Sequence, residues 1–173
     1  MFVDQRLREA ELAFLNAPFE AEGWRHAIER MAEVTRSAVG QLCGFASGLS
    51  LPYNLLSADL HDPHGHLHNP DLYGPDNWRV AVTRGVMTVQ HDVHYADYRA
   101  CNRPSFYDDA CSDLDVPFGC QTALARSGSN ILGLALLRSR KDGPCSGDVL
   151  TNFARLAYQA QRAMRVQIAL GQQ

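Results

Sequence analysis

Two segments on either side of a short polar stretch constrain the fold of this chain more than any other feature. Residues 131–138 (ILGLALLR) are almost wholly apolar, and residues 119–126 precede them across Ser127-Gly128-Ser129-Asn130. A four-residue connection is too short for a crossover between parallel strands, so two strands joined by it must pair antiparallel. The sequence therefore predicts a β-hairpin at 119–126 and 131–138, in a sheet covered by the C-terminal helix.

Apolar residues at helical spacing lie on both sides of this hairpin, in three stretches. The first ends at Pro18, because the residue before a proline is disfavoured in the α region. The second covers residues 23–35, and the third begins near Ser146, a good N-cap. The three apolar faces consist of Val3, Leu7, Ala10, Phe14 and Ala17; of Trp24, Ala27, Ile28, Met31 and Val34; and of Leu150, Phe153, Ala157, Ala160, Met164 and Ile168.

The middle of the chain predicts shorter elements. Residues 39–47 and 53–59 have the pattern of strands joined by a tight turn, and 61–77 that of a loop with short helical turns. A helix through 78–82 ended by Gly85, a strand at 86–90 and one or two short helices in 95–114 follow. We therefore expect residues 1–173 to form one α+β domain of GAF/PAS-like layout. Such a domain has about five mostly antiparallel strands, two N-terminal helices and a long C-terminal helix.

Composition excludes several classes of protein. The 173 residues are 46% hydrophobic and 20% charged, with a formal net charge of −3 and no run of Lys or Arg. Direct binding of nucleic acid needs a basic face, so we do not expect it. Five cysteines without a CxxC pair predict neither a disulfide framework nor a thiolate zinc site. Neither a signal peptide nor a membrane-length apolar run is present, so we expect a cytoplasmic protein.

Histidines are the most conspicuous candidates for metal ligands. They are His61, His64, His66, His68, His91 and His94, and the alternating His64, His66 and His68 would share one strand face. Pro63 and Gly65 favour a flexible, solvated loop instead, so we expect no tightly bound transition metal and no cofactor. The common nucleotide-binding and hydrolase motifs are absent, so we do not expect an enzyme.

Acidic residues surround one cysteine of the middle region. Asp108 and Asp109 could act as an acid and base pair, but adjacent helical residues point about 100° apart, so a solvated helix surface or N-capping is favoured. Cys111 is close in sequence to these carboxylates, which would raise the pKa of its thiol and leave it unreactive.

Aromatic side chains concentrate in the same region and favour a pocket for a small organic molecule, because Tyr and Trp combine an apolar body with a polar tip. The alternative is that these rings are ordinary core. The candidates for binding a ligand are Phe45, Tyr53, Trp78, Tyr98, Phe106 and Tyr107.

Four stretches resemble the N-terminal sensory domain of LuxR-type helix-turn-helix transcriptional regulators. These are 15–18 with 24–32 (WRHAIERMA), 102–109 (NRPSFYDD), 131–138 with 143–146, and 147–170. The resemblance implies a sensory and dimerisation domain with a pocket between its sheet and the middle helices. A DNA-reading helix-turn-helix is expected to be absent from this chain.

The best-known members of that family bind acyl-homoserine lactones through a Trp, a Tyr and an Asp. Tyr53, Asp62 and Trp78 fall at comparable intervals here, but Leu49 occupies the place of the first Trp, which disfavours lactone binding.

Three hypotheses on function remain open. The favoured one is a signal-sensing and dimerisation domain of a transcriptional regulator, with a small organic ligand or none. The others are a small metal-dependent enzyme that uses His61 to His94, and a purely structural dimerisation domain. We also expect a homodimer through the terminal helices, because Val3, Leu7, Ala10 and Phe14 have heptad spacing and 166–170 extend beyond the sheet.

Overall fold

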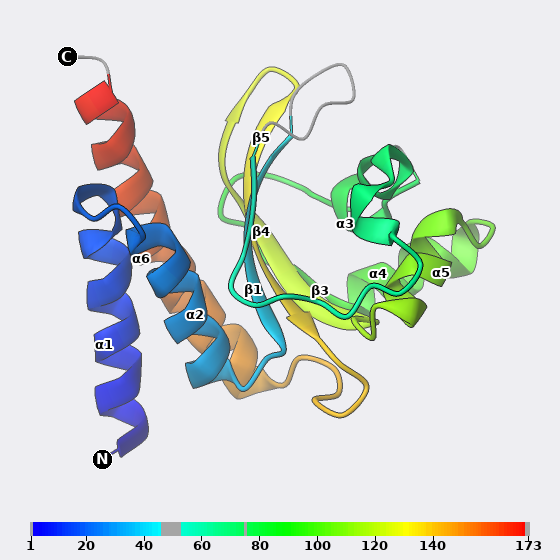
Figure 1. Ribbon diagram of the computed structural model, residues 1–173, viewed down its shortest axis with the longest axis horizontal. Helices are drawn as coiled ribbons and strands as arrows, with labels where there is room; N and C mark the ends of the chain where they lie inside the picture. The colour runs from blue at the N-terminus through cyan, green and yellow to red at the C-terminus, as the bar shows by residue number, and fades with distance from the viewer. Residues whose placement is uncertain (1, 46–52, 75, 172–173) are drawn as a thin grey trace.

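An antiparallel sheet with the strand order β2-β1-β5-β4-β3 forms the middle layer of the molecule (Figure 1). The computed structural model describes residues 2–45, 53–74 and 76–171. Its strands are β1 (Val39–Phe45), β2 (Tyr53–Leu56), β3 (Gln90–His91), β4 (Phe118–Ser127) and β5 (Asn130–Arg138). Every strand pair is antiparallel, which confirms the predicted α+β fold with its five strands.

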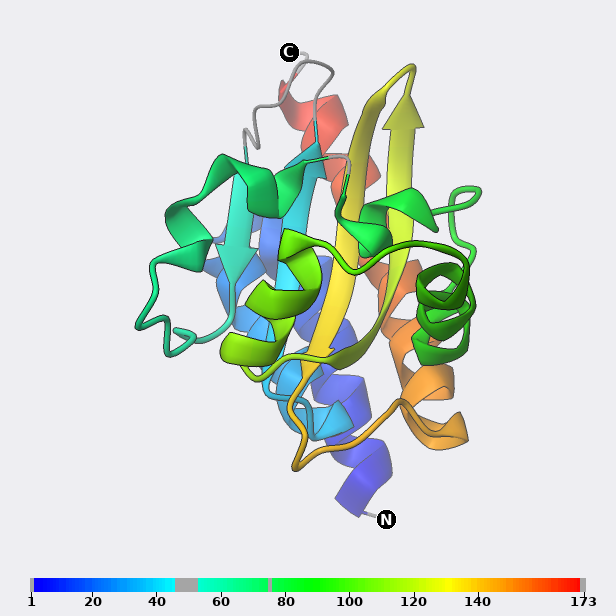
Figure 2. The same ribbon diagram turned by 90° about the vertical axis from the view of Figure 1, so that its right-hand side faces the viewer.

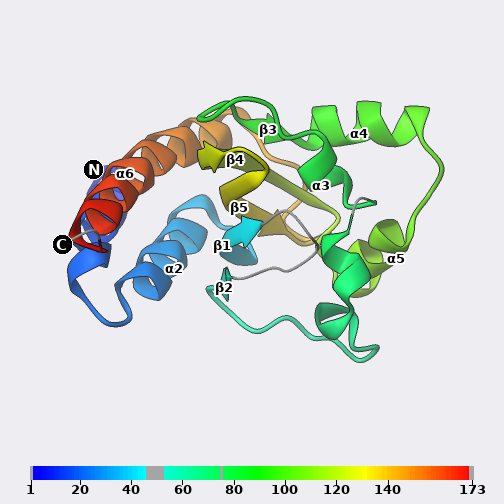
Figure 3. The ribbon, with the colours of Figure 1, turned by 90° about the horizontal axis from the view of Figure 1, so that it is seen from above.

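The three helices with long apolar faces cover one face of this sheet. They are α1 (Phe2–Asn16), α2 (Gly23–Thr35) and α6 (Gly147–Gly171), and Figures 1 and 3 show them together on one side. The apolar faces of α2 and α6 meet the sheet, and that of α1 packs against these two helices, so Phe14, Ile28 and Phe153 are fully buried in one core. The two N-terminal helices and the long C-terminal helix are as predicted.

The opposite face is covered by shorter elements, which lie in front of the sheet in Figure 2. They are the 3₁₀ turns η2 (His66–His68) and η3 (Pro70–Tyr73), and the helices α3 (Trp78–Ala81), α4 (Asp92–Cys101) and α5 (Phe106–Asp113). Their core is centred on the Trp78 ring, whose centroid is 4.8 Å from that of Tyr95 and 5.1 Å from that of Tyr107.

The predicted hairpin is confirmed, with a tighter turn than the sequence indicated. Ser127 pairs with Asn130, so only Gly128 and Ser129 form the turn. Gly128 has a φ of 60°, in the left-handed region that two-residue hairpin turns require.

Three of the predicted elements are shorter in the structure. Strand β3 comprises only residues 90 and 91, because Met87 adopts a φ of 61° that breaks an extended chain. Helix α3 ends at Ala81 rather than near Gly85, since the β-branched residues around it favour helix poorly. Strand β2 ends at Leu56 rather than at 59. Strand β1 is described as far as Phe45, and the predicted turn between β1 and β2 lies outside the described residues. Among the described helices, none has the length and apolar character to cross a membrane.

Candidate functional site

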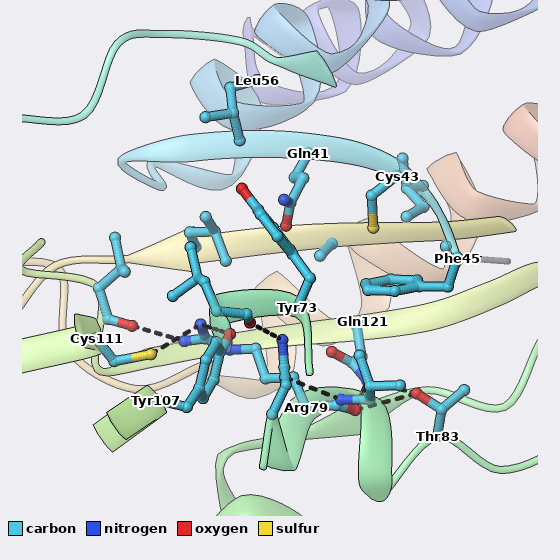
Figure 4. A pocket seen from close by; sticks show the side chains of 18 of the residues that line it. Gln41, Cys43, Phe45, Leu56, Tyr73, Arg79, Thr83, Tyr107, Cys111 and Gln121 are labelled. Carbon is cyan, nitrogen blue, oxygen red and sulfur yellow. Dashed lines mark hydrogen bonds between the residues drawn. The ribbon is translucent and has the colours of Figure 1, made fainter. Parts of the chain in front are cut away.

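A cavity lies between the sheet and the layer that contains α3 and α5. It offers about 70 Å³ to the centres of water molecules, several times the roughly 10–15 Å³ that one water needs. Figure 4 shows Arg79, Tyr107 and Cys111 on one side of it and Cys43 and Phe45 on the other. Its walls are mostly apolar, with contributions from β1, β2, β4, β5, η3, α3 and α5, among them Cys43, Phe45, Leu56, Leu72, Val80, Leu114, Val116, Ala123, Ile131, Gly133, Ala135 and Leu137.

Arg79 is the charged residue in the wall of this cavity. Its side chain is buried, and Nη1 donates to the Tyr107 hydroxyl at 2.9 Å. Nη2 donates to the carbonyl oxygens of Val116 and Phe118 at 2.6 and 3.2 Å. The guanidinium carbon also lies 4.7 Å from the Trp78 ring centroid, within the range of a cation–π contact. A short helix thus positions a cation at the edge of an apolar space.

Gln121 on β4 holds this short helix against the sheet. Its side-chain amide donates to the carbonyl oxygen of Arg79 and to the Thr83 hydroxyl, the latter at 2.8 Å. Thr83 in turn donates to the same carbonyl at 3.0 Å. The backbone from which the guanidinium extends is therefore fixed by hydrogen bonds to a central strand.

A second polar group lines the cavity from η3. The Tyr73 hydroxyl donates to the carbonyl oxygen of Leu67 at 3.3 Å and accepts from the Asn54 amide at 3.2 Å. The Gln41 amide donates to the Asn54 oxygen at 2.8 Å, which connects this chain of hydrogen bonds to β1.

Burial keeps the thiols and the Tyr107 hydroxyl in the cavity wall neutral. It raises the pKa of Cys43 to about 12 and also raises the pKa of Tyr107. Burial is the largest cause of the raised pKa of Cys111 as well, and Asp108 adds less. The expected rise in the pKa of Cys111 is thus found, but burial and not the neighbouring carboxylates is its main cause. The thiol lies beside Arg79 and Tyr107, with Nη1 of Arg79 3.5 Å from its sulfur. None of these thiols has the thiolate character that a nucleophile needs.

The six aromatic candidates do not form one site. Phe45 and Tyr107 line the cavity. Trp78 and Tyr98 line a different, polar hollow of about 270 Å³ with Arg99, Asn102 and Ser105. Phe106 packs against the His66 ring at 5.4 Å between centroids, and Tyr53 on β2 is 42% exposed. Aromatic content alone located the correct region of the chain but did not separate the cavity wall from the core.

Asp62 and Trp78, compared above with lactone-binding positions, lie away from the cavity wall. The Asp62 carboxylate accepts from the backbone N–H groups of His66 and Leu67, both at 2.8 Å. Desolvation opposes its ionisation, but these donors hold the pKa of Asp62 below its usual range. The carboxylate therefore stabilises the loop that contains it. Leu49, the third position of that comparison, lies outside the described residues.

The histidines are dispersed, and the acids cap a helix. The described residues contain no group of three or more His, Cys, Asp or Glu that could hold a metal ion. His66 instead contacts Asp113 at 2.9 Å, and its ring centroid is 5.7 Å from that of His64. Asp108 accepts from the backbone N–H of Ser105 at 2.9 Å, which confirms the predicted capping role of this acid.

Comparison with known proteins supports the fold. No protein-family model matches the sequence, and no curated protein is similar to it. The solved structure of CepR2 from Burkholderia cenocepacia, an N-acylhomoserine lactone-dependent LuxR family transcription factor, matches with a TM-score of 0.62 and 15% sequence identity. The match covers 97% of this chain and 98% of that chain. The resemblance to LuxR-type regulators is thus confirmed in three dimensions: the chain has the fold of a LuxR-family protein.

Arg79 is the residue of the site that the sequence did not indicate. One arginine in a four-residue helix has neither periodicity nor a motif. The only available signal was its place in WRVAV (78–82), where a lone charge interrupts an apolar run.

Proposed function

We propose that this chain is the signal-sensing domain of a LuxR-type transcriptional regulator and that it binds a small organic molecule in the cavity beside Arg79. The observation that carries the proposal is the cavity itself, which has apolar walls and a few fixed polar groups. Such a combination is typical of small-molecule sites. Its place between the sheet and the middle helices is also the place that the family resemblance implies.

The ligand of this cavity is proposed to differ from an acyl-homoserine lactone. CepR2 is described as lactone-dependent. Here the Asp62 carboxylate accepts hydrogen bonds from backbone N–H groups of its own loop, and Trp78 is packed in the core formed by the short helices. The polar side chains in the cavity wall include Arg79, Tyr73 and Tyr107 instead.

A thermal-shift screen tests the binding. A ligand at 100 times its Kd stabilises a protein by about 2.7 kcal/mol, or roughly 5–10 °C for a domain of this size. The panel contains acyl-homoserine lactones, carboxylic acids and their amides. The matched control is Gly133→Val, because Gly133 lines the cavity and a Cβ there would have the Cys43 sulfur at 3.6 Å, an ordinary contact. The valine side chain would then occupy part of the space that the ligand needs. A shift in the wild type that persists in Gly133→Val would place the ligand elsewhere.

The metal-dependent enzyme and the purely structural domain are not proposed. No arrangement among the described histidines favours the first, and the cavity favours sensing over the second. We do propose that the domain forms a homodimer and acts in the cytoplasm. The dimer contact must differ from the heptad seam expected on α1, since Leu7, Ala10 and Phe14 are buried against their own chain.

A further inference from the structure

We propose that the molecule bound in the cavity carries a carboxylate, which pairs with Arg79, on an apolar body. This inference rests on the proposed function, and it names the chemical class of the ligand. The buried charge of Arg79, its unused hydrogen-bonding capacity and its neutral surroundings support it.

Arg79 is a buried cation without an anion. Only 5% of its surface is exposed, and an arginine stays protonated in proteins. In the described part of the chain it forms no ion pair. The titratable groups that face it are Tyr107, Cys111 and Tyr95, all with a pKa raised by burial and all neutral at pH 7. A buried charge is costly unless a counter-charge is supplied.

The hydrogen bonds of Arg79 are also incomplete. Both terminal nitrogens have acceptors, but Nε has no partner among the described residues. Nε is covered as the side chain lies, so a bound acceptor must turn the guanidinium, which lines the cavity, to reach it. Arg138 is equally buried and also forms no ion pair among the described residues, but hydrogen bonds from all three of its guanidinium nitrogens compensate its burial. Its Nε, Nη1 and Nη2 donate to the carbonyl oxygens of Gly143, Thr35 and Asp142 at 2.8, 3.0 and 2.6 Å. Arg79 differs in its free Nε and in lining a cavity.

The chemistry of the ligand follows from the missing anion and from the unpaired Nε of Arg79. A neutral acceptor, such as a lactone or amide carbonyl, would satisfy Nε but leave the charge uncompensated. A carboxylate supplies both an acceptor and the missing negative charge, and guanidinium–carboxylate hydrogen bonds are about twice as strong as neutral ones. The remaining walls, including Phe45, Ile131 and Leu137, require that the rest of the molecule be apolar.

The test compares acids with their own amides. Straight-chain acids of four to ten carbons and phenyl-substituted acids are titrated at pH 7.5 into the full chain by calorimetry, each beside its primary amide. We expect the best acid to bind at least tenfold more tightly than its amide. Gly133→Val should abolish its binding, and Arg79→Met should remove the preference for the acid. Arg79→Lys should retain part of the preference, because it keeps the charge and loses the planar fork.

The outcomes separate this inference from the proposed function. If amides bind as tightly as acids and Gly133→Val still abolishes binding, the cavity is the site and the carboxylate proposal is wrong. If neither acids, amides nor lactones bind, both proposals are wrong. Should Arg79→Met fail to fold, the ratio of acid to amide affinity in the wild type, with Gly133→Val as the control, still decides the question.

Discussion

Gly40 sets the separation between β1 and α2. A Cβ at this position would collide with the carbonyl oxygen of Ile28 and would lie 3.2 Å from the Ile28 Cβ. Both partners belong to the packed core, so neither can move away freely. Gly40→Ala is therefore expected to lower the free energy of unfolding by about 1–3 kcal/mol, the usual cost of overpacking.

Gly147 is the matched control for that substitution. It is the first residue of α6, and a Cβ there would meet nothing within 4 Å. Gly147→Ala should leave stability unchanged or raise it by up to about 1 kcal/mol, because Ala favours helix over Gly. Urea denaturation followed by circular dichroism measures both variants. Equal midpoints for Gly40→Ala and the wild type would contradict the close approach of β1 and α2.

At the same scale, single side chains show why the site could be predicted only in part. Phe45 and Tyr107 line the cavity and Trp78 does not, although all three are aromatic residues of the same region. Which face of a four-residue helix meets the cavity depends on how α3 is held, here by Gln121 on a strand far along the chain. No local pattern encodes that contact, so Arg79 had no signal of its own.

Among the elements, α4 follows β3 directly and is also held to the sheet by one carboxylate. Asp92 opens this helix, and its two oxygens accept from different backbone N–H groups, that of Gly119 at 2.9 Å and that of Cys145 at 2.6 Å. The first belongs to β4, and the second to the segment that leads into α6. One side chain thus joins three elements.

Asp92→Ala should consequently destabilise the domain by about 3–6 kcal/mol, the sum for two hydrogen bonds to a charged group. Both N–H groups would lose a charged acceptor, and hydrogen bonds to charged groups contribute roughly 1.5–3 kcal/mol each. Asp97→Ala is the control, since Asp97 is an exposed acid on the same helix and its removal should change stability by less than about 0.5 kcal/mol. Thermal and urea unfolding give both values. A similar small effect for the two variants would show that the Asp92 contacts contribute little.

Elements with strong periodicity were predictable, whereas those that depend on tertiary contacts were not. The bounds of α2 were predicted as Gly23–Thr35 and are found there, because its apolar face has the helical period and packs on one side. By contrast, β3 is two residues long and exists only through pairing with β4 at Gln121 and Cys120. A strand of that length has no alternation for the sequence to display.

Across the whole molecule, the two sides of the sheet differ in how far the sequence determines them. The side with α1, α2 and α6 buries long apolar faces in a continuous core. The other side combines short helices, an aromatic cluster and a cavity. Short elements that are held by side-chain hydrogen bonds leave space that long helices would fill. The proposed binding site is therefore on that side of the sheet.

The last turns of α6 present apolar side chains that the chain itself does not cover. Val166, Ile168 and Leu170 are 41, 47 and 47% exposed, and Phe19 on the 3₁₀ turn after α1 is 67% exposed. The Trp24 indole donates to Gln167 at 3.0 Å, which places the start of α2 against this end of α6. Figure 1 shows the C-terminal ends of α1 and α6 at the same end of the molecule. Exposed apolar groups that gather in this way mark protein–protein contacts.

We therefore predict that the protein is a homodimer at micromolar concentration, with this end of the helical layer in the contact. Val166 and Leu170 lie four residues apart and share one face of α6, so the double variant Val166→Glu, Leu170→Glu should be monomeric. Val93→Glu is the control, because Val93 is 60% exposed on α4, on the other side of the sheet. Sedimentation velocity should give twice the 19.2 kDa mass of the chain for the wild type and the control. A wild type that sediments as a monomer at tens of micromolar would refute the dimer, and a dimer that survives the double variant would place the contact elsewhere.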